Sequence, residues 1–290
     1  MSAHADANRR GAGFMILAMA AFAIEDALFK SATVSVPPAL ALMIFGATGL
    51  VVFAALAMLR GERPWPQGGL SAGLILRSAF ELAGRLFFAL ALAFTDLAAT
   101  SAILQATPLV VTAGAVLFLG EKVGWRRWLA IAVGFAGVLL VLRPSGAMIA
   151  PTALFAVVAT LGFAGRDLAT RASKPSVTNA QLGTLGFAVL ILAGLTIQSV
   201  AQTPLTVPAA VDFWRLLTAG GFGVVAYSAL TAAMRRGDVA VVTPFRYTRL
   251  PFALVLAVLV FGERPDAVML LGSALIVGSG LFTLARARKR

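Results

Sequence analysis

Residues 22–30 read FAIEDALFK, and residues 163–171 read FAGRDLATR, a related segment 141 positions further along the chain. Two later landmarks keep nearly the same spacing. Asp96 aligns with Asp238, and the joint Gly120-Glu121-Lys122 aligns with Gly262-Glu263-Arg264, each displaced by 142 positions. Shared apolar composition does not explain charged residues at fixed offsets. The chain is therefore predicted to contain two copies of one unit, residues 1–145 and residues 146–290.

Each copy is long enough for five membrane-spanning helices. A hydrocarbon layer about 30 Å thick needs roughly 17 to 25 apolar residues in helical form. Ten such runs fit the sequence, at residues 11–34, 36–59, 71–94, 97–119, 125–142, 150–172, 179–200, 212–234, 238–261 and 266–285. Because five is odd, the second copy must insert upside down. The predicted fold class is an all-α polytopic membrane protein with ten transmembrane helices in two inverted five-helix repeats, an architecture of transporters.

The composition excludes most other classes of protein. Of the 290 residues, 60% are hydrophobic and only 12% are charged, which is too apolar for a soluble domain. Cysteine is absent and His4 is the single histidine, so disulfides, thiol nucleophiles and His/Cys metal sites are excluded. A Walker-type Gly-Lys-Ser/Thr run is also absent, so a gradient is the expected energy source. We predict no catalytic residue, no metal and no cofactor.

The formal net charge of +12 is explained by membrane topology. One face of the predicted bundle carries 15 Lys and Arg residues, and the opposite face carries two, Arg143 and Arg264. Cytoplasmic loops carry such an excess in membrane proteins. Both termini are therefore predicted to be cytoplasmic in a bacterial-type inner membrane. Nucleic-acid binding is disfavoured because the cations are spread over alternate loops.

The charged segments and the prolines carry a family resemblance. Each half starts with an aromatic-Ala-x-x-Asp pattern, and Pro108 lies thirteen residues before Glu121 in the first Gly-Glu joint. In these features the chain resembles the EamA-type drug/metabolite transporter superfamily, and its overall form is similar to YddG-type amino-acid exporters. The resemblance implies that helices one, three, four, six, eight and nine line a central cavity. The second half departs from the pattern, because Pro251 lies twelve residues before Glu263, which leaves the substrate open.

Ten charged side chains fall inside the predicted spans, where each costs at least about 2.5 to 3.5 kcal/mol unless it faces a cavity or a partner. They are Glu25, Asp26, Lys30, Arg77, Glu81, Arg85, Arg166, Asp167, Arg246 and Arg249. Spacings of four residues predict pairs between Asp26 and Lys30 and between Glu81 and Arg85, and Arg77 is expected to reach Glu81 from the preceding turn. Helix nine holds two arginines and no acid, so their partners must come from other helices or from a substrate carboxylate.

The candidate site residues follow from these charges and from nearby polar, aromatic and proline residues. Candidates for the substrate cavity are Phe80, Glu81, Arg85, Gln105, Phe163, Tyr227, Arg246, Tyr247 and Arg249. Candidates for ion coupling are Asp26, Glu81 and Asp167, and candidate hinges are Pro108, Pro244 and Pro251. Ordinary helix packing by the aromatic residues, structural pairing of the charges and harmless proline kinks are the alternatives.

The sequence favours a secondary transporter that exports amino acids or related metabolites by alternating access. A carrier for another metabolite, a cofactor precursor or a drug is the alternative within this class. Two other classes remain, a passive channel and an intramembrane lipid-modifying enzyme that would use Glu25, Asp26 and Glu81. The expected partners are a small-molecule substrate and the lipid bilayer, with no nucleic acid, and the functional unit is expected to be a monomer.

Overall fold

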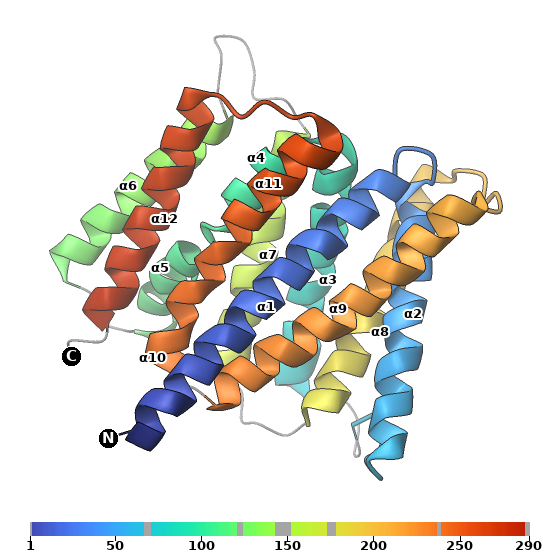
Figure 1. Ribbon diagram of the computed structural model, residues 1–290, viewed down its shortest axis with the longest axis horizontal. Coiled ribbons are helices and arrows are strands. Elements are labelled where there is room, and N and C mark those ends of the chain that lie inside the picture. The colour runs from blue at the N-terminus through green and yellow to red at the C-terminus, as the bar shows by residue number, and fades with distance from the viewer. Residues whose placement is uncertain are drawn as a thin grey trace.

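The computed structural model describes residues 2–66, 71–120, 124–142, 152–172, 178–236 and 239–287, which form helices joined by short turns (Figure 1). The α-helices are α1 (Ser2–Ala32), α2 (Pro38–Leu59), α3 (Ala72–Phe94), α4 (Leu97–Leu104), α5 (Thr107–Leu119), α6 (Trp125–Leu142), α7 (Ala153–Ala172), α8 (Asn179–Ala201), α9 (Ala210–Arg236), α10 (Val239–Val242), α11 (Arg249–Phe261) and α12 (Ala267–Ala287). A 3-10 helix, η1 (Thr243–Thr248), lies between α10 and α11.

Two of the ten predicted spans are broken helices. The fourth span is divided into α4 and α5, and the ninth is divided into α10, η1 and α11. Proline explains both interruptions, because it lacks an amide hydrogen and is tolerated in the first turn of a new helix. Pro108 is the second residue of α5, and Pro244 is the second residue of η1. The predicted kinks are therefore present as breaks in the two spans.

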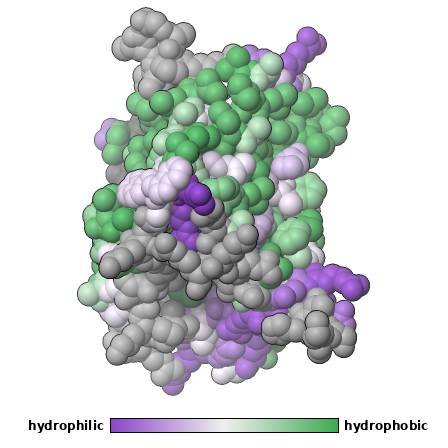
Figure 2. Space-filling view, turned by 90° about the vertical axis from the view of Figure 1, so that its left-hand side faces the viewer, coloured by the Kyte–Doolittle hydropathy of each residue, from purple (hydrophilic) through white to green (hydrophobic). Residues whose placement is uncertain are grey.

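The described helices have the length and the surface of membrane-spanning segments. Among the residues that the structure describes, nine segments are long and apolar enough to cross a bilayer. The tenth, α3, has 23 residues but carries Arg77, Glu81 and Arg85. Figure 2 shows apolar side chains gathered over the upper part of the face formed by α6 and α12, with hydrophilic side chains at mid-height and along the lower edge. Exposed Leu129 and Leu139 of α6 and Leu271 of α12 belong to the apolar surface of these two helices. The predicted fold class is confirmed.

The helices pack in pairs that match an inverted repeat. If each helix is exchanged for its counterpart in the other half, the pair α1 with α9 becomes the pair α7 with α3, and both pairs are observed. The pairs α2 with α8 and α6 with α12 each join a helix to its own counterpart. Both termini lie at the lower edge of the bundle in Figure 1, as an even number of crossings requires.

Small residues allow the paired helices to approach closely. A Cβ atom added at Gly137 of α6 would lie 2.6 Å from the carbonyl oxygen of Gly272 in α12, and one added at Gly272 would lie 2.7 Å from the Gly137 oxygen. At the α3–α7 contact, a Cβ atom added at Gly162 would lie 2.5 Å from the Gly84 nitrogen. In lipid, burying apolar side chains between helices gives little free energy because the lipid tails are equally apolar. Helices therefore associate through close van der Waals packing, which small residues allow.

Candidate functional site

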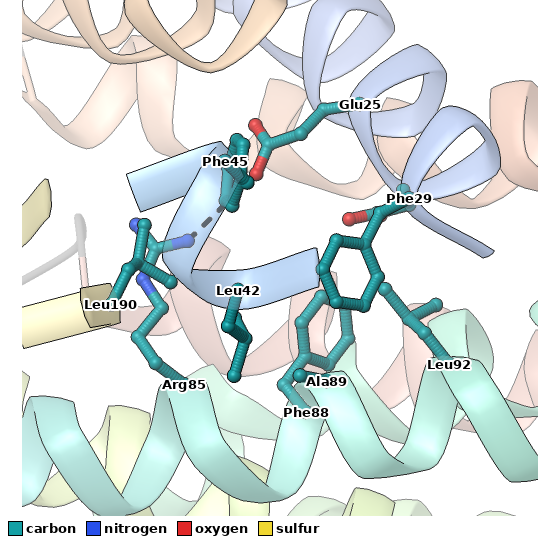
Figure 3. Close-up of a pocket in the computed structure, with 10 residues that line it drawn as sticks. Glu25, Phe29, Leu42, Phe45, Arg85, Phe88, Ala89, Leu92 and Leu190 are labelled. Carbon is teal, nitrogen blue, oxygen red and sulfur yellow. Dashed lines mark ion pairs between the residues drawn. The ribbon is translucent and has the colours of Figure 1, made fainter. Parts of the chain in front are cut away.

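A narrow cavity with about 20 Å³ of free space lies between helices of both halves. Its walls come from α1, α2, α3 and α8, and its lining residues are Glu25, Asp26, Phe29, Leu42, Phe45, Arg85, Phe88, Ala89, Leu92 and Leu190. Figure 3 shows Glu25 reaching from α1 toward Arg85 of α3, with the rings of Phe29 and Phe88 on the other side. The cavity therefore combines both signs of charge with an aromatic wall.

The cavity differs from the one that the family resemblance implied. Helices one and three contribute to it as expected, but helices two and seven, observed as α2 and α8, replace helices four, six, eight and nine. Of the nine predicted cavity residues, Arg85 lines it. The other eight surround it or lie further out, because their helices direct these side chains into charge pairs and packing contacts.

Asp26 and Arg249 form a close ion pair across the two halves. Arg249 donates from Nη2 to Asp26 Oδ2 at 2.5 Å and from Nε to the same oxygen at 3.2 Å. The guanidinium also lies 5.0 Å from the centre of the Phe22 ring and 5.5 Å from that of Phe88. Arg249 therefore already has an anionic partner. The predicted pair between Asp26 and Lys30 is wrong, because the Asp26 carboxylate is directed to α11.

A second cluster of charges lies around Glu81. Arg77 Nη1 is 2.8 Å from Glu81 Oε2, and Arg166 Nη1 is 3.7 Å from Glu81 Oε1. Arg166 also donates to Asp167 at 2.8 Å, and Arg246 lies 4.0 Å from Asp167. The cluster joins α3 to α7 and η1. The predicted contact between Arg77 and Glu81 is present. The predicted Glu81–Arg85 pair is wrong, because Arg85 turns toward Glu25.

Lys30 and Glu263 satisfy helix ends at the edge of the bundle opposite the termini. Lys30 donates to the carbonyl oxygens of Leu92 at 3.2 Å and Thr95 at 2.5 Å, after the last turns of α3. The Glu263 carboxylate accepts from the amides of Leu97 at 2.7 Å and Ala98 at 2.9 Å, at the start of α4. Both sets of contacts place a charge of favourable sign at a helix end, and the Glu263 contacts also connect the two halves.

The remaining predicted residues have identifiable contacts. Gln105 donates to the backbone oxygen of Arg246 at 3.4 Å. Phe163 lies edge-on to Phe88 with ring centres 5.9 Å apart, and Tyr227 lies edge-on to Phe53 at 5.5 Å. Tyr247 is buried with no hydrogen-bond partner for its hydroxyl among the described residues, whereas the Phe80 side chain is partly exposed. These contacts leave the substrate role of each residue open to experiment.

A proline leaves the carbonyl group one turn earlier without its amide donor, and at one break a threonine hydroxyl supplies the missing hydrogen bond. The Thr107 hydroxyl donates to the Leu104 oxygen at 2.6 Å, which is the oxygen that an amide at Pro108 would otherwise bond. The Thr248 hydroxyl donates to the Phe245 oxygen at 2.7 Å, close to Pro251. The first of these contacts takes the oxygen that a substrate group would have used. The joint at residues 120–122 and Asp238 fall wholly or partly outside the described residues.

Glu25 is a cavity residue that the prediction of substrate contacts omitted. Its side chain is 5% exposed and lines the cavity. The internal repeat contains the signal that could have singled it out. Asp26 aligns with Asp167, but Glu25 aligns with Arg166, so the charge at this position changes sign between the halves.

Comparisons with known proteins agree with this architecture. Residues 9–143 and residues 146–285 each match the EamA-like transporter family. An S-adenosylmethionine uptake transporter of Rickettsia bellii is 27% identical over 215 residues, covering 74% of this chain and 73% of the relative. A riboflavin transporter of Rhizobium johnstonii is 32% identical over 192 residues, covering 65% of this chain and 62% of the relative.

Two further matches extend over almost the whole chain. The pseudopaline exporter CntI of Pseudomonas aeruginosa is 26% identical and covers 98% of this chain and 99% of its own length. A crystal structure that is 20% identical covers 96% of this chain and 98% of its own, with a TM-score of 0.66, which shows a shared fold. The named relatives are transporters, so the chain is a membrane transporter and not an enzyme. Because the family matches both halves of the sequence, the chain belongs to the EamA-like transporter family within the drug/metabolite transporter superfamily.

Proposed function

We propose that this chain is a secondary transporter that exports amino acids or similar small metabolites across the inner membrane by alternating access. The observation that carries the proposal is the central cavity, which is lined from both halves and bears Glu25, Asp26 and Arg85 beside aromatic rings. In this conformation the cavity leaves only about 20 Å³ of free space, far below the range of about 300 to 1,000 Å³ found for drug-sized ligands. The proposal therefore requires the cavity to widen when a substrate enters, as alternating access does.

Alternating access needs two halves that meet through contacts able to break and re-form. Several contacts between the halves are polar, including Asp26 with Arg249 and Glu263 with the start of α4. The breaks at Gln105–Ala106 and at η1 interrupt the fourth and ninth spans near these contacts. Broken helices at the interface between inverted repeats are a recurring arrangement in secondary transporters. This arrangement supports Pro108 and Pro244 as hinge positions, whereas Pro251 lies in the first turn of α11 and not at a break.

The test is counterflow into liposomes that contain only the purified protein. The panel contains amino acids, riboflavin and S-adenosylmethionine, because relatives are named for the last two. A carrier gives saturable uptake that is accelerated by unlabelled substrate inside, whereas a channel gives uptake that does not saturate. Counterflow of riboflavin without any amino acid would support the alternative, a carrier for a cofactor precursor. Absence of saturable counterflow for every compound would refute the proposal.

Conformational change is tested separately, and the absence of cysteine gives a clean background. Ala89 lines the cavity, so a single Ala89→Cys substitution places a thiol there. We expect a membrane-impermeant maleimide to label this thiol from one side of the membrane, and a transported substrate to change the labelling rate. Equal labelling with and without a transported substrate would contradict alternating access at this cavity.

Proton coupling is proposed at one of Asp26, Glu81 and Asp167. All three carboxylates lie among arginines inside the bundle, at distances of 2.5 Å, 2.8 Å and 2.8 Å from their nearest cationic atoms. Neutralisation to Asn or Gln should abolish pH-driven accumulation in at least one variant while counterflow continues. If all three variants accumulate substrate like the parent, coupling by these residues is refuted.

A further inference from the structure

Of the acids Glu25, Asp26, Glu81 and Asp167 inside the predicted spans, Glu25 has the most distant cationic partner. Their nearest cationic nitrogens lie 2.5 Å from Asp26, 2.8 Å from Glu81, 2.8 Å from Asp167 and 3.8 Å from Glu25. Glu25 Oε2 and Arg85 Nε have no hydrogen-bond partner among the described residues, although both atoms are buried. A buried polar atom without a partner is unfavourable. The two groups are therefore close and incompletely bonded.

These unsatisfied groups belong to residues that line the central cavity. Glu25 projects from α1 and Arg85 from α3, and the two side chains point toward each other (Figure 3). Phe29, Phe45 and Phe88 line the same cavity. Asp26 also lines it, but Arg249 already occupies its carboxylate with two hydrogen bonds. The available polar atoms are thus one carboxylate oxygen and one guanidinium edge, next to an aromatic wall.

The repeat separates this pair from the structural charges. Asp26 and its counterpart Asp167 both have close arginine partners. The aspartate at this position of the repeat therefore forms an ion pair in each half. Arg85 aligns with Tyr227 and Glu25 aligns with Arg166, so neither member of the pair is reproduced in the second half. A pair that the shared architecture does not require is free to serve a role of its own.

We propose that Glu25 and Arg85 form a recognition pair that a zwitterionic substrate opens, with its ammonium group on the Glu25 carboxylate and its carboxylate group on the Arg85 guanidinium. This rests on the proposed function and specifies its substrate class. A zwitterionic substrate has no net charge, so its binding leaves the net charge of the cavity unchanged. It replaces the long Glu25–Arg85 contact by two ion pairs, one on each side chain. A simple anion would meet Glu25 and Asp26, and a simple cation would meet Arg85 and Arg249. Both are therefore disfavoured relative to a zwitterion with an apolar side chain.

The test measures binding of radiolabelled L-phenylalanine to the purified protein, because the cavity wall is aromatic. The competitors are phenethylamine, which lacks the carboxylate, and 3-phenylpropionate, which lacks the ammonium group. We expect unlabelled phenylalanine to compete at least tenfold better than either analogue. A hydrogen bond to a charged group is worth about 1.5 to 3 kcal/mol, so Arg85→Gln and Glu25→Gln should each weaken phenylalanine binding by about 10- to 150-fold.

The decisive readout is the change in specificity, which a purely structural role would not produce. Arg85→Gln should lose the preference for phenylalanine over phenethylamine, and Glu25→Gln should lose the preference over 3-phenylpropionate. The matched control is Arg215→Gln, because Arg215 pairs with Asp212 near the start of α9 and does not line the cavity. If either single variant fails to fold, the double variant keeps the net charge and should lose both preferences.

Two results would overturn the inference. One is unchanged specificity in folded Glu25 and Arg85 variants. The other is that phenylalanine does not bind, or that it binds no more tightly than phenethylamine and 3-phenylpropionate. If riboflavin or another compound still shows counterflow in that case, the transporter proposal stands and the recognition pair is refuted. If no compound in the panel shows counterflow, both proposals fail.

Discussion

The Asp26–Arg249 pair gives the sharpest prediction about stability, because it joins the two halves inside the bundle. The Asp26 side chain is 1% exposed and that of Arg249 is 14% exposed. Replacing Arg249 with Gln leaves a buried carboxylate without its cation, and loss of one partner from a buried pair costs about 3 to 5 kcal/mol. Loss of the contacts with the Phe22 and Phe88 rings adds to this cost, since each such contact is worth about 0.5 to 2 kcal/mol.

The assay is the free energy of unfolding in mixed detergent micelles, titrated with SDS and followed by the fluorescence of the four tryptophans. Arg249→Gln should lose about 3 to 5 kcal/mol. Asp26→Asn should lose less, because the freed guanidinium keeps its contacts with two aromatic rings. The double variant contains no unpaired charge at this position. It should therefore be more stable than Arg249→Gln, with a coupling free energy of at least about 1 kcal/mol.

Two results would refute this reasoning. If Arg249→Gln unfolds like the parent, the pair does not stabilise the bundle. If the losses from the two single variants simply add in the double variant, Asp26 and Arg249 do not interact in the folded protein. Either result would return Arg249 to the list of cations available for a substrate carboxylate.

Three further predictions concern topology, helix packing and the edge opposite the termini. A single Arg60→Cys thiol should react with an impermeant maleimide only from the cytoplasmic side, and labelling of intact cells from outside would contradict the predicted orientation. Gly137→Ala should destabilise the protein by about 1 to 3 kcal/mol because its Cβ atom would meet the Gly272 backbone, whereas Gly278→Ala, which meets nothing within 4 Å, should not; similar SDS unfolding of both variants would disprove the close contact. Glu263→Gln should lower the unfolding free energy by about 0.5 to 2 kcal/mol by weakening the contact with the start of α4, and an unchanged value would show that this contact is not stabilising.

The sequence by itself determined the fold of this protein to a large extent. The bilayer admits few solutions, because every buried backbone group must be bonded within a helix or a closed barrel. Apolar run length therefore predicted the ten spans, and the repeated charged segment predicted the two inverted halves. The prolines also marked the breaks correctly, since their missing amide acts within one turn of the same helix. These features depend on local sequence and on the solvent.

The partners of the intramembrane charges were decided only by the tertiary structure. Helical spacing correctly predicted the contact between Arg77 and Glu81 within α3. It also predicted pairs of Asp26 with Lys30 and of Glu81 with Arg85, yet Asp26 bonds to Arg249, 223 positions away, and Arg85 faces Glu25. A helix places several residues on one face, but helix rotation and the identity of the neighbouring helix decide which partner lies closest. The cavity depends on the same choices, because α2 and α8 complete its wall with apolar residues that carry no distinctive signal in the sequence.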